Sequence, residues 1–234
     1  MSIIVAFVSR EGWVVASDGR IFTSAKTVGG QVVQAPPIES DECDKTFFCW
    51  DGLIVGAHAD LMRFCGKTVG EHVVECLHAQ GEPHMDVVAA ADAVEKELCR
   101  RLEGIDAAEV GFDRRKVDLL LVGYSGGNAR FPRIAALHFE SKDQTIIARR
   151  ELVSGRKDKR FYLYGNPEAQ IGASRVFRSS KAPNRDVAFL RSLACQAVSA
   201  GIQSSGTYPQ SSSKCCGGKV STRALSARKN ARGV

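Results

Sequence analysis

Hydrophobic residues along the chain follow two periods, and these periods predict the secondary structure. Short apolar stretches rich in Val, Ile and aromatic residues, bounded by Gly, Asp or Pro, are typical of strands. They occur at residues 2–8, 13–17, 45–50, 53–56, 117–124, 133–139, 146–152, 160–164 and 219–225. Apolar residues at spacings of three and four predict helices at residues 57–79, 85–102, 167–177 and 186–202.

The order of these segments predicts the architecture. Strands come first, followed by two helices, further strands, two more helices and a last strand. This order favours an α+β fold, a four-layer αββα sandwich in which two mostly antiparallel sheets lie between helix pairs. No linker interrupts the pattern, so residues 1–226 are predicted to form a single domain and the basic residues 227–234 a flexible tail. Residues 22–43, which contain paired Gly and paired Pro, are expected to form a loop or a mobile hairpin.

Composition places the chain among globular proteins. Of its 234 residues, 44% are hydrophobic and 25% are charged, which excludes a largely disordered chain. The net charge of +6 comes from the C-terminal end, where seven Lys and Arg residues and no acidic residue follow residue 186. A basic tail of this kind is usually solvated, so nucleic-acid binding is not expected; it would reveal itself by a steep dependence of affinity on salt.

Three features predict a cytoplasmic protein. No apolar run approaches the roughly 20 residues of a membrane span, and the first ten residues lack the basic start of a signal peptide. The eight cysteines include no C-x-x-C spacing, which argues against a disulfide framework and against a structural zinc site. A membrane, a metal ion and a cofactor are therefore not expected.

Ser2 follows the initiator Met, which methionine aminopeptidase removes before small residues. The mature chain would then begin with a free amine beside a hydroxyl. Serine alone is a poor nucleophile and needs a base, and an α-amine with a pKa of about 7.7–8.0 supplies one on the same residue. Because serine is common at this position, Ser2 alone does not distinguish an enzyme from a protein without this activity.

The segments that follow Ser2 strengthen the interpretation. The apolar run 2–7, a turn that ends in Gly12, and the sequence Trp-Val-Val-Ala-Ser-Asp-Gly-Arg at 13–20 resemble the opening of proteasome β-type subunits. These subunits belong to the N-terminal nucleophile (Ntn) hydrolase superfamily. The resemblance places Ser2 on the family's catalytic threonine and Asp18 on its catalytic aspartate. A Gly-Gly pair at 217–218 likewise resembles the turn that leads to a late strand of that family.

The same resemblance implies two further catalytic residues. Residues 44–48 are similar to the family's lysine strand and residues 53–60 to the Gly-rich turn that opens its first helix, which implies Lys45 as the catalytic lysine and Gly56 as the oxyanion donor. The Lys45 ammonium would lower the pKa of the Ser2 hydroxyl, and the amine would take its proton. Without the resemblance, Asp18 could cap a turn and Lys45 could be a surface lysine, with Lys26 as its rival. Gly56 could simply permit a tight turn.

Other residues receive roles only through the resemblance. By position, the specificity pocket would draw on Cys43, Phe47, Ile54 and His58. Groups that support the amine and the lysine in the family align here with Ser213, Cys216 and Glu168, although none of the three keeps the family's residue type. Cys216 and Ser213 can still form hydrogen bonds, so these substitutions weaken the supporting shell without removing it.

These observations predict a peptidase of the threonine-type endopeptidase family with Ser2 as its nucleophile. The resemblance implies proteolysis of peptides or proteins inside a ring-shaped, self-compartmentalised homo-oligomer, which an AAA+ unfoldase would feed. Two alternatives stay open. A catalytically silent ring subunit, acting as scaffold or gate, is favoured by the altered supporting residues, and a related Ntn amidase would act on a small amide.

Overall fold

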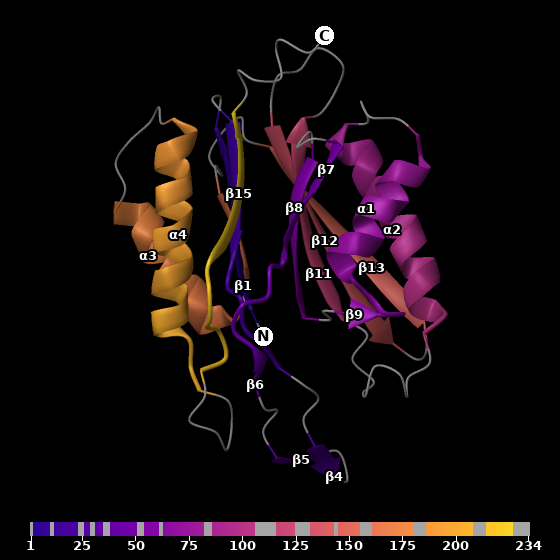
Figure 1. The fold of residues 1–234 in the computed structure, drawn as a ribbon, viewed down its shortest axis with the longest axis horizontal. Helices are drawn as coiled ribbons and strands as arrows, with labels where there is room; N and C mark the ends of the chain where they lie inside the picture. The colour runs from indigo at the N-terminus through magenta and orange to yellow at the C-terminus, as the bar shows by residue number, and fades with distance from the viewer. Residues whose placement is uncertain are drawn as a thin grey trace.

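The computed structural model of the chain places four helices and two large sheets side by side (Figure 1). The residues that the structure describes are 2–9, 12–22, 26–28, 31–34, 38–50, 54–60, 63–81, 86–105, 116–124, 132–142, 145–154, 161–179, 186–207 and 214–226. The predicted basic tail at 227–234 lies outside these residues, and the single domain over 1–226 stays a prediction.

The first large sheet has four strands in the order β14-β1-β2-β15, all antiparallel. Its strands are β1 (Ile3–Ser9), β2 (Gly12–Ser17), β14 (Phe161–Gly165) and β15 (Ser221–Ser226). Every residue of β2 is buried, because one face of this sheet packs on helices and the other on the second sheet. Ser2 therefore lies at the very start of a central strand.

The second large sheet has five strands in the order β13-β12-β11-β8-β7, again all antiparallel. Its strands are β7 (Thr46–Cys49), β8 (Ile54–Asp60), β11 (Val117–Tyr124), β12 (Pro132–Lys142) and β13 (Thr145–Ser154). The predicted strands at 117–124, 133–139 and 146–152 are confirmed. The Asp-Gly turn predicted before β8 lies outside the described residues.

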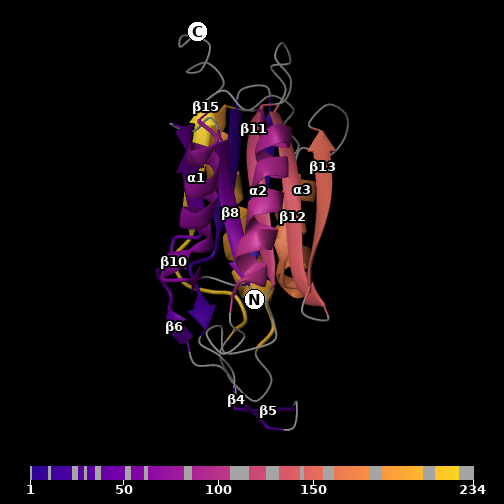
Figure 2. The same cartoon turned by 90° about the vertical axis from the view of Figure 1, so that its right-hand side faces the viewer.

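Two pairs of helices cover the outer sides of these sheets (Figures 1 and 2). Helices α1 (Val69–Ala79) and α2 (Val87–Glu103) pack on the five-stranded sheet, and α3 (Pro167–Ser179) and α4 (Val187–Ser204) on the four-stranded sheet. A capping box of Thr68 and Glu71 begins α1, and the Asp86 carboxylate accepts two backbone N–H groups at the start of α2. These side chains fix where the helices start.

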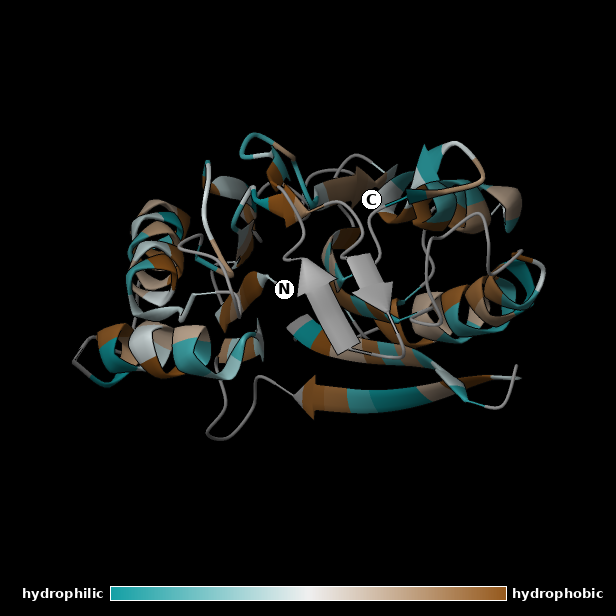
Figure 3. Cartoon of the chain, turned by 90° about the horizontal axis from the view of Figure 1, so that it is seen from below, coloured by the Kyte–Doolittle hydropathy of each residue, from teal (hydrophilic) through white to brown (hydrophobic). Residues whose placement is uncertain are grey.

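Three hydrophobic clusters form the core. One lies between the five-stranded sheet and α1 and α2, the second between the four-stranded sheet and α3 and α4, and the third between the two sheets. Side chains that alternate along each strand divide between two of these clusters: Val55 and Ala57 of β8 face the other sheet, whereas Ile54 faces the helices. Seen from below, each helix carries both hydrophobic and hydrophilic residues (Figure 3).

The predicted fold class was wrong. A four-layer αββα sandwich has two sheets, whereas the described residues form five antiparallel sheets, and fifteen strands against four helices make the fold mostly β. The three additional sheets are two-stranded: β3 (Ile21–Phe22) with β6 (Ile38–Ser40), β4 (Lys26–Val28) with β5 (Gln31–Gln34), and β9 (Arg63–Phe64) with β10 (Lys67–Thr68). Two of them arise from the segment predicted as a loop or hairpin, whose turn residues hid its short strands from a periodicity argument.

The first predicted helix was also partly wrong. Residues 57–60 continue β8, and α1 begins only at Val69. Ala57 and Ala59 face the other sheet while β7 and β11 pair with both edges of β8, so the pairing of strands outweighs a helical spacing of apolar residues. The other predicted helices are confirmed as α2, α3 and α4. Within the described residues, no helix has the length and apolar character needed to cross a membrane.

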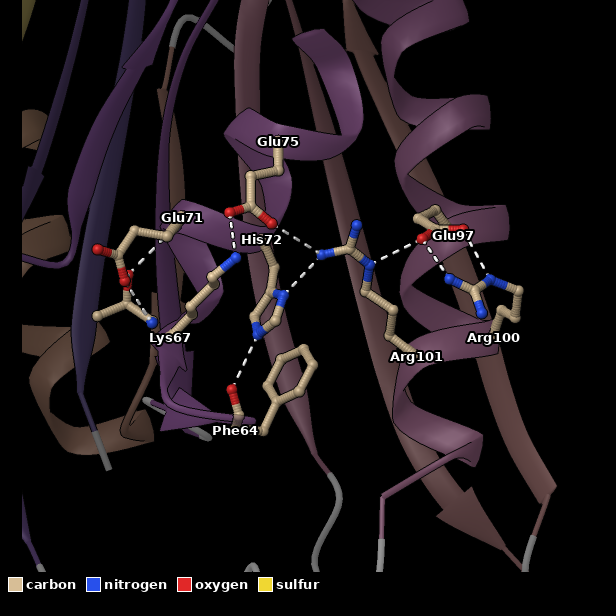
Figure 4. Close-up of polar contacts among 9 residues, drawn as sticks. Phe64, Lys67, Glu71, His72, Glu75, Glu97, Arg100 and Arg101 are labelled. Atoms are coloured by element: carbon tan, nitrogen blue, oxygen red, sulfur yellow. Dashed lines mark hydrogen bonds and ion pairs between the residues drawn. The ribbon is translucent and has the colours of Figure 1, made fainter. Parts of the chain in front are cut away.

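A buried histidine links α1 to α2 (Figure 4). His72 is 4% exposed, and its ring stacks on that of Phe64 with 3.8 Å between centroids. Its Nε2 lies 2.9 Å from the carbonyl oxygen of Phe64 and must donate to it, whereas Nδ1 lies 2.7 Å from Nη1 of Arg101 and must accept. His72 is therefore neutral in this network. Arg101 also donates to Glu97 (2.7 Å) and Glu75 (3.3 Å).

An Arg101→Leu variant is expected to lose about 1–3 kcal/mol of unfolding free energy, because Nδ1 of the buried His72 is left without a donor. Urea denaturation monitored by circular dichroism measures this loss. Arg100→Leu is the matched control: Arg100 donates to the same Glu97, but its side chain is 72% exposed and little change is expected. Equal losses in the two variants would show that the His72 link adds nothing to stability.

Candidate functional site

Ser2 is held at the junction between the first sheet and α3. The residue is 3% exposed, and its carbonyl oxygen accepts the backbone N–H of Asn166 at 2.8 Å. The Asn166 side chain in turn accepts the N–H of Ala169 at 2.9 Å, in the first turn of α3. Asn166 thus connects Ser2 to the first turn of α3 and restrains the backbone of Ser2 next to β1.

Lys45 brings its ammonium group to the Ser2 hydroxyl from the second sheet. The lysine lies immediately before β7 and is fully buried. Its Nζ donates to Oγ of Ser2 (2.8 Å), to Oδ1 of Asp18 (3.0 Å) and to the carbonyl oxygen of Arg20 (2.7 Å). An ammonium has three N–H donors, and all three have an acceptor here. The geometry therefore fits a protonated Lys45 that donates to the serine hydroxyl.

Asp18 completes this arrangement. Its carboxylate is fully buried directly after β2, where Oδ1 accepts the Ile3 N–H (3.1 Å) as well as Lys45, and Oδ2 accepts the Gly217 N–H (3.1 Å). Two backbone donors and one ammonium therefore satisfy the charge inside the protein. Lys45 thus lies within hydrogen-bonding distance of both Ser2 and Asp18, and the catalytic roles of these three predicted residues stay predictions.

The Gly-Gly pair at 217–218 closes this site from the C-terminal side. The Gly217 carbonyl accepts the N–H groups of Gly19 (3.1 Å) and Arg20 (2.9 Å). A Cβ on Gly217 would meet the Arg20 guanidinium, and Gly218 has a φ of 76° that favours glycine. Arg20 binds the two carboxylate oxygens of Asp41 at 2.6 and 2.8 Å, and this pairing lowers the pKa of Asp41.

The structure does not place Gly56 where the oxyanion prediction requires it. Gly56 was expected in a turn that opens the first helix, but it lies within β8 and pairs with Phe47 on one side and Leu121 on the other. A Cβ at this position would overlap the Phe47 ring. Close packing therefore explains this glycine, and its backbone N–H belongs to the sheet rather than to an exposed turn.

The predicted pocket residues separate into two groups. Phe47 and Ile54 belong to the core beneath α1 and α2, and their role in a specificity pocket stays a prediction. Cys43 is half-buried two residues before Lys45, and burial raises the pKa of its thiol. His58 is 1% exposed, and burial followed by the charge of Lys45 lowers its pKa to about 3. His58 therefore stays neutral near the ammonium.

The predicted supporting residues also differ in position. Cys216 is fully buried next to Gly217, and burial, followed by the charge of Asp18, raises the pKa of its thiol to about 12. Glu168 is exposed in the first turn of α3 and lies close to Gly206. Ser213 lies outside the described residues. Sequence reasoning missed Asn166, although an Asn before Pro-Glu is an N-terminal helix signal that could have drawn attention to it.

A second polar cluster lies at the same end of the two sheets. Lys116 contacts Asp60 at 3.0 Å and Asp118 at 3.3 Å, and the Nδ1–H of His138 donates to Asp118 at 2.8 Å. Burial, followed by the hydrogen bond and charge of Asp118, raises the pKa of Asp60 to about 6. Burial would raise the pKa of Asp118 as well, but hydrogen bonds from His138, Asp60 and Tyr164 lower it. Of the two carboxyls, Asp60 therefore has the higher pKa. Among the described residues, no group of three or more His, Cys, Asp or Glu side chains could hold a metal ion.

Asp60→Asn is expected to change how stability depends on pH. A carboxyl whose pKa is higher in the folded than in the unfolded chain stabilises the fold at low pH. This contribution is lost as the pH rises through the pKa of the folded chain, which for Asp60 means from about pH 4 to above pH 6. As the pH rises from about 4 to 7.5, the unfolding free energy of the variant should therefore increase relative to that of the native chain by on the order of 2 kcal/mol. Urea denaturation at both pH values tests this, with Asp92→Asn, at an exposed ion pair with Arg150, as control. A parallel pH dependence in both chains would contradict it.

The chain was compared with known proteins. No known protein family matches it, and no curated protein matches it either. Among solved structures, it is similar to the Gly-1 mutant of Anbu from Hyphomicrobium sp. strain MC1, with a TM-score of 0.56 and 13% sequence identity. The match covers 97% of this chain and 88% of the Anbu chain. At this identity the likeness shows the fold alone.

These comparisons correct the family prediction. The motifs at 2–60 led to the proteasome β-type subunits of the Ntn hydrolase superfamily, but no family matches and the structural likeness is a distant one to Anbu. The resemblance was carried by short segments, and short motifs recur in unrelated chains. Activity therefore has to follow from the geometry of the site rather than from family membership.

Proposed function

We propose that this protein hydrolyses amide bonds in peptides, with Ser2 as an N-terminal nucleophile. The observation that carries this proposal is the fully buried Lys45 ammonium, which donates to the Ser2 hydroxyl at 2.8 Å and to Asp18 at 3.0 Å. A positive charge at this distance stabilises the serine alkoxide and lowers the pKa of the hydroxyl. The arrangement thus activates one particular oxygen at the start of the chain.

The burial of this ion pair supports a functional role. Removing two charges from water costs several kcal/mol per ion before their attraction repays it, and a well-packed apolar pair is often as stable or more stable. Lys45 and Asp18 have no exposed side-chain surface, yet they lie beside Ser2 at the end of the sheet where β1 begins. Buried charges of this kind, which destabilise the fold unless they are paired, cluster at active sites.

The base in this proposal is the amine of Ser2 itself. Lys45 donates three hydrogen bonds, which fits an ammonium group. An ammonium has no lone pair, so Lys45 cannot take the proton of the hydroxyl. After removal of Met1, the α-amine accepts the hydroxyl proton as Oγ bonds to the substrate carbonyl carbon. The amine then returns this proton to the leaving nitrogen as the C–N bond breaks, which gives an acyl-enzyme. Water attacks the ester in the same way and releases the acid.

A catalytically silent protein is the second candidate, and one observation favours it. Gly56 lies within β8, so it does not supply the exposed N–H that would stabilise an oxyanion. A silent chain would keep the buried ion pair for structure alone.

Ring assembly, a homo-oligomer, an unfoldase partner and a cytoplasmic location stay proposals. Sedimentation velocity at several protein concentrations tests self-association, and a monomer at all of them would exclude a ring.

Intact mass spectrometry tests the proposed function. The purified protein is weighed before and after incubation with a peptide epoxyketone, whose stable ring adduct requires a free terminal amine and its neighbouring hydroxyl. We expect the loss of Met1 followed by one adduct per chain. Met1 removed without any adduct favours the silent protein, and hydrolysis of fluorogenic peptides by the same sample decides between them. A retained Met1 contradicts the proposed base, because the amine is then blocked.

A further inference from the structure

The segment that connects Asp18 to Lys45 leaves the candidate site and returns to it as paired strands. It leaves along β3 and returns along β6, which pair antiparallel. Between them, β4 and β5 extend beyond the end of the sheets at which β1 begins (Figures 1 and 2). Asp18 lies just before β3 and Lys45 shortly after β6. The two ends of this segment therefore have to be held together if both side chains are to meet beside Ser2.

Arg20 is the residue at which the start of this segment meets Lys45. Its carbonyl oxygen accepts a hydrogen bond from Nζ of Lys45 at 2.7 Å, and its backbone N–H donates to the Gly217 carbonyl at 2.9 Å. In its guanidinium, Nε and Nη2 donate to the carboxylate of Asp41 at 2.6 and 2.8 Å, and Nη1 donates to the Lys214 carbonyl at 3.1 Å. The position of one acceptor of Lys45 therefore depends on what holds Arg20.

Asp41 holds the end of the same segment, directly after β6. Its backbone carbonyl accepts the N–H of Lys219 at 2.6 Å, and a Cβ on Gly218 would overlap its backbone. Beside it, the Cys43 N–H donates to the Gly19 carbonyl at 3.0 Å. Asp41 thus contacts the Gly-Gly turn through its backbone and the start of the segment through its carboxylate.

We propose that Asp41 is a positioning residue for the Lys45 ammonium and that it acts through Arg20. The consequence for Ser2 reactivity rests on the proposed function, whereas the placement of Lys45 does not. A bidentate pair between Arg and a carboxylate fixes orientation as well as distance. Without it, the Arg20 backbone is free to turn, and Lys45 loses one of its three acceptors. A misplacement of about 1 Å in an active site can slow the reaction about 100-fold.

The exposure of this ion pair makes its positioning role separable from stability. The Asp41 side chain is 43% exposed, and ion pairs exposed to this degree contribute little to stability. Asp41→Asn keeps the shape of the side chain and one acceptor oxygen, but it removes the charge and the second acceptor of the bidentate pair. The variant should therefore fold, and an altered Lys45 would not be a consequence of unfolding.

Asp44→Asn is the matched control. The Asp44 side chain is 40% exposed, pairs with Arg223 and lies next to Lys45 along the chain. Its Oδ1 also accepts the N–H of Thr46 at 2.9 Å, which an Asn side chain can still do. Loss of a negative charge near Lys45 would affect both variants. Loss of the contact with Arg20 would affect only Asp41→Asn.

Exchange of the Lys45 ammonium protons with solvent, measured by ¹⁵N NMR, is the first readout and does not require an active protein. These protons should exchange slowly in the native chain, because the group is fully buried and has three acceptors. We expect exchange at least about tenfold faster in Asp41→Asn and within about twofold of the native rate in Asp44→Asn. Urea denaturation of the same samples reports any general loss of stability.

Labelling of Ser2 by the epoxyketone is the second readout. The rate constant at saturating probe should fall roughly tenfold in Asp41→Asn and in Arg20→Gln, while the half-saturating concentration stays within about twofold. The double variant should react no more slowly than the slower single variant, because both changes remove the same contact. In a variant that stays folded without urea, a loss of stability alone leaves this rate constant unchanged.

Each result has a defined meaning. Lys45 exchange that is unchanged in Asp41→Asn overturns the positioning role, and so does an equal rise in Asp44→Asn or a native ammonium that exchanges too fast to detect. Faster exchange with an unchanged labelling rate constant overturns the link to Ser2 reactivity. Faster exchange in a protein whose Ser2 never reacts, even in the native chain, overturns the proposed function and supports the positioning role. If Asp41→Asn does not fold, Arg20→Gln carries the same comparison.

Discussion

A Ser2→Ala variant is expected to form no epoxyketone adduct and to lose peptide hydrolysis at least roughly 10³-fold, because among the described residues the Lys45 ammonium donates to no hydroxyl other than that of Ser2. The fold should survive, since the change leaves one N–H donor of Lys45 unsatisfied and costs about 1–3 kcal/mol, which is less than the stability of a typical domain. Intact mass after labelling, initial rates on a fluorogenic peptide library and urea denaturation measure the three quantities.

Two further variants make the Ser2 result specific. Ser2→Thr keeps the amine and the hydroxyl, and its β-methyl restricts the side-chain rotamer, so labelling and hydrolysis should persist. Ser174→Ala removes a hydroxyl in α3 that donates to the Ile171 carbonyl, and it should leave both readouts unchanged. Hydrolysis that survives in Ser2→Ala would mean that another residue, or a contaminating enzyme, carries the activity.

Lys45→Met is expected to be the most destabilising of these changes and to abolish labelling as well. Removal of one partner of a buried ion pair leaves the other charge uncompensated, which typically costs 3–5 kcal/mol. Here the remaining charge is Asp18, whose side chain is fully buried and keeps only two backbone donors. Chemical denaturation measures the loss, and the labelling rate reports whether the hydroxyl is still activated.

A double variant separates stability from activity at Lys45. Lys45→Met combined with Asp18→Asn removes both charges, so much of the lost stability should return while labelling stays absent. Lys67→Met is the surface control: Lys67 pairs with Glu75 at 2.5 Å with about half of its side chain exposed, and little change is expected. If Lys45→Met labelled at the native rate, the ammonium would have no role in activating Ser2.

Periodicity predicted most of the regular elements because each depends on neighbours close in sequence. The strands at 117–124 and 146–152 and the helices α2, α3 and α4 are where apolar spacing puts them. It failed where long-range pairing competes with local pattern, as in residues 57–60, which join β8 between two neighbouring strands. It also overlooked the two-stranded sheets, since their strands of two to four residues are too short to show a period.

For the site, sequence motifs identified Ser2, Asp18 and Lys45 as residue types suited to the chemistry, and the folded chain brings them together. Their contacts span 27 and 43 positions of sequence, and the Gly217 donor lies 199 positions from Asp18. Local patterning cannot specify such contacts, because they depend on how two sheets pack. The same packing places Phe47 and Ile54 in the core beneath α1 and α2 and brings Asn166 next to Ser2. The sequence alone therefore identified which residue types could take part in the chemistry. Their positions relative to one another were decided only by the packing of the two sheets.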